Sequence, residues 1–432
     1  MRSEQEFERF GERPGAVTRL VLVLGLVLIQ AACGGGGGGG GGAPAPAPPP
    51  APAPPPPPTM TGDDARRAVL ADIAEDIILP ALVTFETDAA ALQAAATALA
   101  TAPTDIPTRD AARTAWNSAM DSWQRNEMLQ VGPAGRSTNP DPVAGGQDFR
   151  DAIYSWPFTL DSCALEEAAA NAEAVDNTTP INITGLGAIE HLLYTDVPPA
   201  ACTAQPDATA RAAHIVRLAD RVVLVATTLR NRWEPGTGNF VEQWSTAGLA
   251  TSQIYSQPQD ALDALSIALF YAEKQTKDRK VAQPTGLPAT GLDCSDPIAC
   301  PEFLESRLSR RTGTNLIVNM QAFRDVFTGI NGGMGVNDLL IGINRQDLAD
   351  EIVAEVDAAL AFLADIENGN GFDAEVEAIA DATECANAFA SSSGLPPCAL
   401  LGFLKTAMDT FRGPIVSALS LAVPSSAAGD ND

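Results

Sequence analysis

The sequence predicts an all-α protein in which two helical bundles pack as one unit. Beyond residue 60, apolar residues recur every three or four positions along most of the chain, which is the spacing of one face of an α-helix. No segment alternates apolar and polar residues as a half-buried strand would. Hydrophobic residues make up 45% of the chain and aromatic residues only 6%, so the core must consist mainly of alanine and leucine. These observations together favour helices.

The first predicted helix opens at Thr61, which stands before two aspartates in the position of a helix cap. Its apolar stripe continues to Leu99, and Pro80 lies inside it. Because proline removes one backbone donor and crowds the preceding turn, we expect the helix to bend or divide there. A second helix is expected from about Arg109 to Val131, and Gly132-Pro133 ends it.

Further apolar stripes predict the remaining long helices. The last stripe is the longest, and Gly413-Pro414 is expected to bend it. Loops rich in glycine, proline and asparagine separate several stripes, and we divide the folded part, 62–425, into one bundle of about 62–240 and another of about 241–425. The stripes run through Ile215 to Trp233, Leu262 to Leu269, Leu316 to Phe327, Ile352 to Leu363 and Leu400 to Leu419.

Cys33 separates an apolar run from a low-complexity segment. The run from Leu20 to Ala32 has the length of a signal-peptide core and is too short to span a membrane, while residues 33–60 are rich in glycine and proline. This pattern is typical of a bacterial lipoprotein signal, in which residues 1–32 are removed and Cys33 carries the lipid. A buried strand that ends in cysteine is the alternative, but polyglycine beside it could not pack. Gly34, in place of aspartate, favours the outer membrane, facing the periplasm.

The chain carries 54 acidic against 27 basic residues, a net charge of −27. Such a charge repels nucleic acid and anionic headgroups and favours cations or basic partners, so nucleic-acid binding is not expected. The simpler interpretation, solubility, also accounts for most of this charge.

Six cysteines remain beside Cys33, an even number that suits an exported protein. Six cysteines allow fifteen pairings, and free buried thiols are the other alternative. Our prediction pairs nearest neighbours, which gives Cys163-Cys202, Cys294-Cys300 and Cys385-Cys398. No cysteine or histidine spacing indicates zinc.

No familiar catalytic signature is present, and His191 and His214 are the only histidines. The segment from Gly185 to Tyr194, GLGAIEHLLY, is the most suggestive of a site. Two glycines there precede an apolar helical run with an isolated acid, Glu190, which must find a partner or change its pKa if it is buried.

Several separated stretches resemble the imelysin-like proteins. The resemblance implies two four-helix-type bundles, export or lipid anchoring, and a GxHxxE motif in the groove between the bundles. It also implies an association with bacterial iron uptake, in a family once labelled as metallopeptidases. The stretches are VLADIAEDIILPAL, AWNSAMDSWQRNEMLQVGPAG, YSWP, GLGAIEHLLY and ESRLSRRTGTNLIVNMQAFRDVFTG.

The motif is altered at its central position. When GLGAIE is aligned on GxHxxE, Gly185 takes the glycine and Glu190 the glutamate, but Gly187 stands in place of the histidine. Glycine has no side chain to coordinate a metal. His191 cannot substitute, because adjacent helical residues point about 100° apart. The chain thus resembles the predicted lipoproteins of the family that lack this histidine, and an enzymatic role is not favoured.

The resemblance also places Glu127, Arg150, Trp156 and Ser309 near the groove. Each position has a structural alternative. The tryptophans are expected to pack in the core, Glu127 and Arg150 to pair with each other, and Ser309 to be an ordinary surface hydroxyl. For Glu190 the functional and the structural interpretations remain equally open.

We therefore expect a non-enzymatic, lipid-anchored protein that binds a ligand or metal in its groove and works with an iron or haem transport system. Glu190 and Glu127 are the candidate metal ligands, since carboxylates suit iron(III), calcium or magnesium. A metallopeptidase of the imelysin type is the first alternative. The second is a structural or partner-binding lipoprotein.

Overall fold

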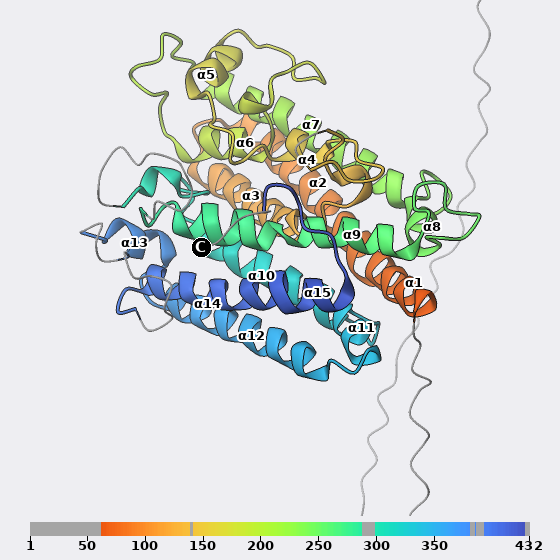
Figure 1. Cartoon of the computed structure of the whole chain (residues 1–432). Helices are drawn as coiled ribbons and strands as arrows, with labels where there is room; N and C mark the ends of the chain where they lie inside the picture. The colour runs from red at the N-terminus through yellow and green to blue at the C-terminus, as the bar shows by residue number, and fades with distance from the viewer. Residues whose placement is uncertain (1–61, 139–140, 287–298, 381–384, 386–392, 428–432) are drawn as a thin grey trace, which may run out of the picture. The chain divides into compact units, whose positions relative to one another are not determined.

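The computed structural model describes residues 62–138, 141–286, 299–380, 385 and 393–427. The chain divides into two units, residues 1–57 and 58–432, and every described residue belongs to the second. None of the described residues lies in a β-strand, and the all-α prediction is confirmed (Figure 1). The expected signal peptide, the tether and Cys33 lie outside the described residues, so they stay predictions.

The first helical stretch is continuous but changes its type at the predicted break. Helix α1 (Asp63–Asp72) passes into the π-helix η1 (Ile73–Ile78), which passes into α2 (Leu79–Thr101). Pro80 stands in the first turn of α2, where its missing N–H is tolerated. The helix does not divide at this proline as expected. A wider π turn precedes Pro80, and the chain continues as a helix. Gly62, with φ of 72°, precedes α1.

The N-terminal half forms one layer of helices around buried tryptophans. Helix α2 packs against α3 (Ile106–Glu127) and α7 (Ala208–Trp233), and α6 (Gly185–Tyr194) contacts both α3 and α7. Trp116 and Trp123 are fully buried, as expected for core residues. Shorter elements complete this half: η2 (Gly132–Ala134), α4 (Phe149–Ile153), α5 (Ser162–Ala170), η3 (Ile181–Ile183) and α8 (Phe240–Ser245).

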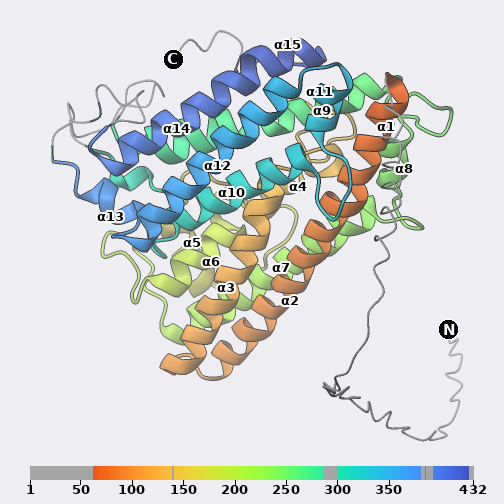
Figure 2. The ribbon, with the colours of Figure 1, turned by 90° about the horizontal axis from the view of Figure 1, so that it is seen from below.

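The C-terminal half forms a second layer on the other side of the unit (Figure 2). Its long helices pack mainly on one another, with α12 against α10 and α14, and η4 against both α10 and α14. Pro414 lies inside the π-helix η7, which replaces the expected bend. The elements are α9 (Pro258–Leu269), η4 (Ala272–Ala282), η6 (Pro301–Phe303), α10 (Thr312–Thr328), α11 (Val336–Gly342), α12 (Gln346–Asn368), α13 (Phe372–Glu377), α14 (Pro396–Thr410), η7 (Phe411–Ile415) and α15 (Val416–Leu419).

Several elements join the layers. Helix α3 and the π-helix η1 both contact α10, and α1 packs against α9 and α11 of the C-terminal half as well as against α8. The division into bundles at about residue 240 stays a prediction. Within the described part of the chain, no helix combines the length and the apolar character that crossing a membrane requires.

Two of the expected disulfides are present. Cys163 pairs with Cys202 and Cys385 with Cys398. The third predicted pair, Cys294-Cys300, includes a residue outside the described ranges, so that pairing stays a prediction. Cys300 itself is buried.

Candidate functional site

Helix α6 begins at a glycine that other residues cannot replace without strain. Gly185 has φ of 73°, in the left-handed region, and a Cβ on it would lie 2.3 Å from the carbonyl oxygen of Ile153 in α4. At Gly187 a Cβ would have only the ring of Tyr154 within 4 Å, at 3.8 Å. Gly185 therefore allows α6 to approach α4 closely, whereas Gly187 leaves room beside Tyr154.

This contrast predicts opposite effects for two similar substitutions. Gly185→Ala is expected to lower the free energy of unfolding by about 2 kcal/mol or more, because alanine is strained at positive φ and meets the Ile153 carbonyl. Gly187→Ala is expected to raise it by about 0.5–1 kcal/mol, because glycine is a poor residue inside a helix. Urea unfolding curves of the two variants provide the measurement. Similar values for both would contradict the placement of α6.

Glu190 lies inside the protein and reaches the other layer. Its side chain is buried, and its Oε1 accepts hydrogen bonds from the backbone N–H of Ser309, at 2.9 Å, and from the Ser309 hydroxyl, at 2.8 Å. Ser309 belongs to the turn before α10. Two residues expected in the groove, one from each half of the chain, are thus in direct contact, and Ser309 is not an ordinary surface hydroxyl.

Glu127 and Arg150 form a buried ion pair close to the end of α3. Nη2 of Arg150 lies 3.1 Å from Oε2 of Glu127, whose side chain is fully buried. Two further donors are Nε1 of Trp123, 2.6 Å from Oε1, and Nε2 of Gln130, 2.8 Å from Oε2. Both carboxylate oxygens are therefore engaged, and the structure shows the mutual pairing that was the alternative to a ligand role.

Tyr154 places an unpartnered hydroxyl among these acids. Its oxygen is buried and has no hydrogen-bond partner among the described residues. Burial raises the pKa of Tyr154 well above its ordinary value, and the charges of Glu305 and Glu190 add to the shift, so the hydroxyl stays protonated. A buried hydroxyl without a partner destabilises the fold by about 1–3 kcal/mol, and a water or ligand at this place would remove that cost. Tyr154 opens the YSWP stretch, but nothing in the sequence marks it as a candidate site residue.

A second buried ion pair was not expected from the sequence. Nζ of Lys280, in η4, lies 3.0 Å from Oε2 of Glu305, and both side chains are fully buried. Nζ also donates to Oε1 of Gln124 and Oδ1 of Asn319, each at 2.7 Å. The sequence around Lys280, EKQTKDRK, has the composition of a solvated surface and gives no sign of burial. Its partner Glu305 is the first residue of one of the stretches that carry the family resemblance. That resemblance was the sequence feature that could have indicated this ion pair.

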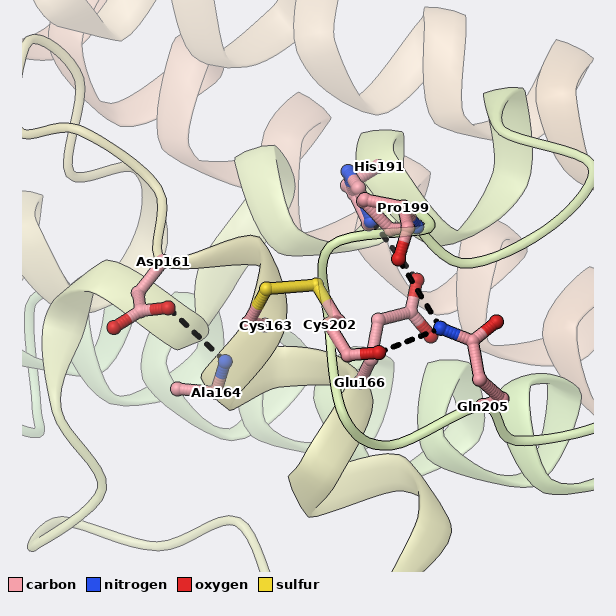
Figure 3. Close-up of a disulfide and its surroundings, with 8 residues drawn as sticks. All are labelled: Asp161, Cys163, Ala164, Glu166, His191, Pro199, Cys202 and Gln205. Carbon is pink, nitrogen blue, oxygen red and sulfur yellow. Dashed lines mark hydrogen bonds and ion pairs between the residues drawn. A yellow bond between two sulfur atoms is a disulfide. The ribbon is translucent and has the colours of Figure 1, made fainter.

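The two histidines are engaged away from Glu190. Figure 3 shows His191 facing Glu166 of α5, with Nε2 2.9 Å from Oε1, and the Cys163–Cys202 disulfide nearby. His214 accepts a hydrogen bond on Nδ1 from Arg217, at 2.9 Å. His191 therefore does not replace the absent motif histidine, as expected from its direction on the helix.

The described side chains do not form a preformed metal centre. Glu127 is occupied by Arg150 and its other donors, and Oε1 of Glu190 is occupied by Ser309. Across the described ranges, no three histidine, cysteine, aspartate or glutamate side chains gather as metal ligands. A metal held by Glu190 and Glu127 remains a hypothesis for direct titration.

Glu190 makes stability depend on pH. Burial raises the pKa of Glu190 to about 7, the Ser309 hydrogen bonds oppose the shift, and Glu305 and Asp373 add to it. The folded state therefore binds more protons than the unfolded state between about pH 4.5 and 7, and stability falls as the pH rises through that window. The variant Glu190→Gln lacks this pH-dependent loss. Its free energy of unfolding minus that of the wild type should therefore rise by up to about 3 kcal/mol between pH 4.5 and pH 8.

Urea unfolding of both proteins across this pH range measures the difference. Glu351→Gln, at an exposed position of α12, is the control and should follow the wild type. If the difference in free energy of unfolding between the wild type and Glu190→Gln stays constant with pH, this would contradict the burial of an ionisable Glu190.

Comparisons with known proteins agree with this architecture. The family model described as Imelysin matches residues 78–391. Iron-regulated protein A of Synechococcus elongatus is 29% identical over 223 residues, which are 51% of this chain and 52% of that protein. The match thus spans about half the length of this curated relative.

Two solved structures share the fold. One, proposed to be an iron-regulated protein A precursor, from Parabacteroides distasonis, has a TM-score of 0.61 at 17% identity and covers 83% of this chain and 96% of that one. The other, an imelysin-like protein from Psychrobacter arcticum, has a TM-score of 0.61 at 14% identity and covers 84% and 98%. At these identities the likeness concerns the fold alone.

Proposed function

Because the chain belongs to the imelysin family, we propose that it is a lipid-anchored envelope protein of iron or haem acquisition that binds a ligand and catalyses no reaction. The contact between Glu190 and Ser309 carries the proposal. It joins the two layers at a buried carboxylate, beside the unpartnered hydroxyl of Tyr154. The link to iron rests on the relative from Synechococcus elongatus, which is named for iron regulation.

The proposed lack of peptidase activity follows from the altered motif. A metallopeptidase needs a metal-bound water and two or three protein ligands. This chain has Gly187 where the motif histidine stands, and its two histidines are engaged with Glu166 and Arg217. Cleavage of a protein substrate by the purified chain, abolished by a chelator, would overturn this part of the proposal.

Calorimetric titration tests ligand binding. The purified chain is titrated with iron(III), calcium, magnesium and haem, beside the Glu190→Ala variant and the control Glu351→Ala. We expect an iron species to bind to the wild type and to the control, and to lose at least tenfold in affinity in Glu190→Ala. Absence of binding, or equal affinity in all three proteins, would leave the structural or partner-binding role. Loss of metal binding in Glu127→Ala as well would support the two-carboxylate metal site.

Membrane fractionation tests the anchor. The wild-type precursor expressed in a Gram-negative host is expected in the outer-membrane fraction, and the Cys33→Ala variant in a soluble fraction, since Cys33 is the proposed lipid attachment site. An unchanged distribution would contradict lipidation at Cys33. An iron or haem transporter is the proposed partner.

A further inference from the structure

Two adjoining pockets lie on one side of η4, and neither Glu190 nor Ser309 lines them. Their volumes are about 310 Å³ and about 270 Å³. Arg150 lines the first pocket and Lys274 the second. The two pockets share one wall, which is formed by Gln130, Arg136, Tyr271, Gln275 and Arg279. A ligand in one lobe could therefore extend into the other along this wall.

Two guanidinium groups in the shared wall have no ion-pair partner within contact distance among the described residues. In the part of the chain that the structure describes, the side chains of Arg136 and Arg279 form no hydrogen bond or ion pair. Arg136 is exposed and Arg279 is half-buried, and both side chains line the wall that the two pockets share. Unpaired bases gathered in a cavity indicate an anion as the missing partner.

The acids that line the pockets are already engaged. Asp151 accepts a hydrogen bond from Arg150 at 3.1 Å, and Asp148 accepts one from the backbone N–H of Ser137 at 2.8 Å. Asp141 accepts from the backbone N–H and the hydroxyl of Ser425. These carboxylates have partners of their own and do not neutralise Arg136 or Arg279.

The surroundings of Arg279 also favour an added negative charge. Burial lowers the pKa of Arg279, Asp278 opposes the shift, and repulsion from Arg150 lowers the pKa further. On the same wall, Oε1 of Gln275 is buried without a hydrogen-bond partner among the described residues. An anion beside Arg279 would relieve the repulsion from Arg150, and the Gln275 amide could turn to donate to it.

We propose that this double pocket binds a small multivalent oxyanion, a polycarboxylate or a phosphate, between Arg136 and Arg279. The planar guanidinium group suits both chemistries, because it can donate two parallel hydrogen bonds to a carboxylate or a phosphate. The two lobes allow a ligand with more than one anionic group. This site is separate from the ligand site proposed at Glu190.

Calorimetry on the full mature chain in metal-free buffer tests the proposal, with citrate as the polycarboxylate and inorganic phosphate as the second probe. At least one probe is expected to bind, and Arg279→Gln and Arg136→Gln should each weaken its affinity tenfold or more. The control is Arg232→Gln, which removes the same charge at an exposed position of α7 and should bind as the wild type does. The preferred probe identifies the chemistry of the ligand.

Two results would overturn the proposal: no binding of either probe at millimolar concentration, or equal weakening in Arg232→Gln, which would indicate only a general charge effect. Circular dichroism checks that each variant is folded, and Arg136→Gln alone serves as the test if Arg279→Gln does not fold. Glu190→Ala should keep its affinity for the anion, so failure at the double pocket and failure of the ligand site at Glu190 are distinguishable.

Discussion

Replacing Lys280 by methionine is expected to lower the free energy of unfolding by about 3–5 kcal/mol. The substitution keeps most of the side-chain volume but removes the charge that faces Glu305 at 3.0 Å. Glu305 then remains fully buried with hydrogen bonds from Gln124 and Asn315 and with no opposite charge beside it. An isolated buried carboxylate is strongly unfavourable, so the loss should be large. Urea unfolding monitored by circular dichroism measures it.

Two further variants show whether the loss comes from the unpaired charge. Lys405→Met removes a lysine from the partly exposed pair with Asp409 and should lower stability by no more than about 1 kcal/mol. The double variant Lys280→Met/Glu305→Leu should recover much of the loss, because it leaves no buried charge. A single-variant effect as small as that of Lys405→Met would show that Lys280 is not buried beside Glu305.

Removing the Cys163–Cys202 disulfide, by alanine at both positions, is expected to lower the free energy of unfolding by about 4 kcal/mol at 25 °C. The bridge spans a sequence separation of 39 residues, and closing a loop of this length restricts the unfolded chain. It also links α5 to the loop before α7, and Glu166 of α5 lies 2.9 Å from His191 (Figure 3). The same carboxylate lies 3.2 Å from Arg211.

The second disulfide provides the comparison. Cys385 and Cys398 are 13 residues apart, so the same pair of alanines there should cost less, about 3 kcal/mol. Thermal and urea unfolding of the two double variants, under oxidising conditions, measure both. A smaller loss at Cys163–Cys202 than at Cys385–Cys398 would contradict the loop-length argument.

The helices could be predicted from the sequence because their apolar spacing is regular over many turns. The stripes near Leu70, Trp116 and Leu404 correspond to α1, α3 and α14. Pro80 follows a π turn directly and Pro414 lies within one, where a division and a bend were expected. The kind of disturbance could not be foreseen, since a π turn depends on how the neighbouring helices pack and not on the proline alone.

The site was only partly predictable. Glu190 was identified in the sequence as an isolated acid in an apolar helical run, Ser309 came from the family resemblance, and the structure brings the two together. Lys280 could not be found, because its charged surroundings in sequence look solvated and its partners Gln124 and Glu305 come from distant segments. The hydroxyl of Tyr154 could not be identified either, because the lack of a hydrogen-bond partner is a property of the folded chain and not of the sequence.

The π turn η1 has a consequence for dividing this protein into fragments. It lies between two helices with different packing partners: α1 packs on α8, α9 and α11, while α2 packs on α3 and α7. Residues 63–101 therefore serve both halves of the fold. A fragment that ends near residue 240 would carry α1 without α8, α9 and α11, the helices against which it packs. We therefore expect the two halves to be stable only when they are present in one chain.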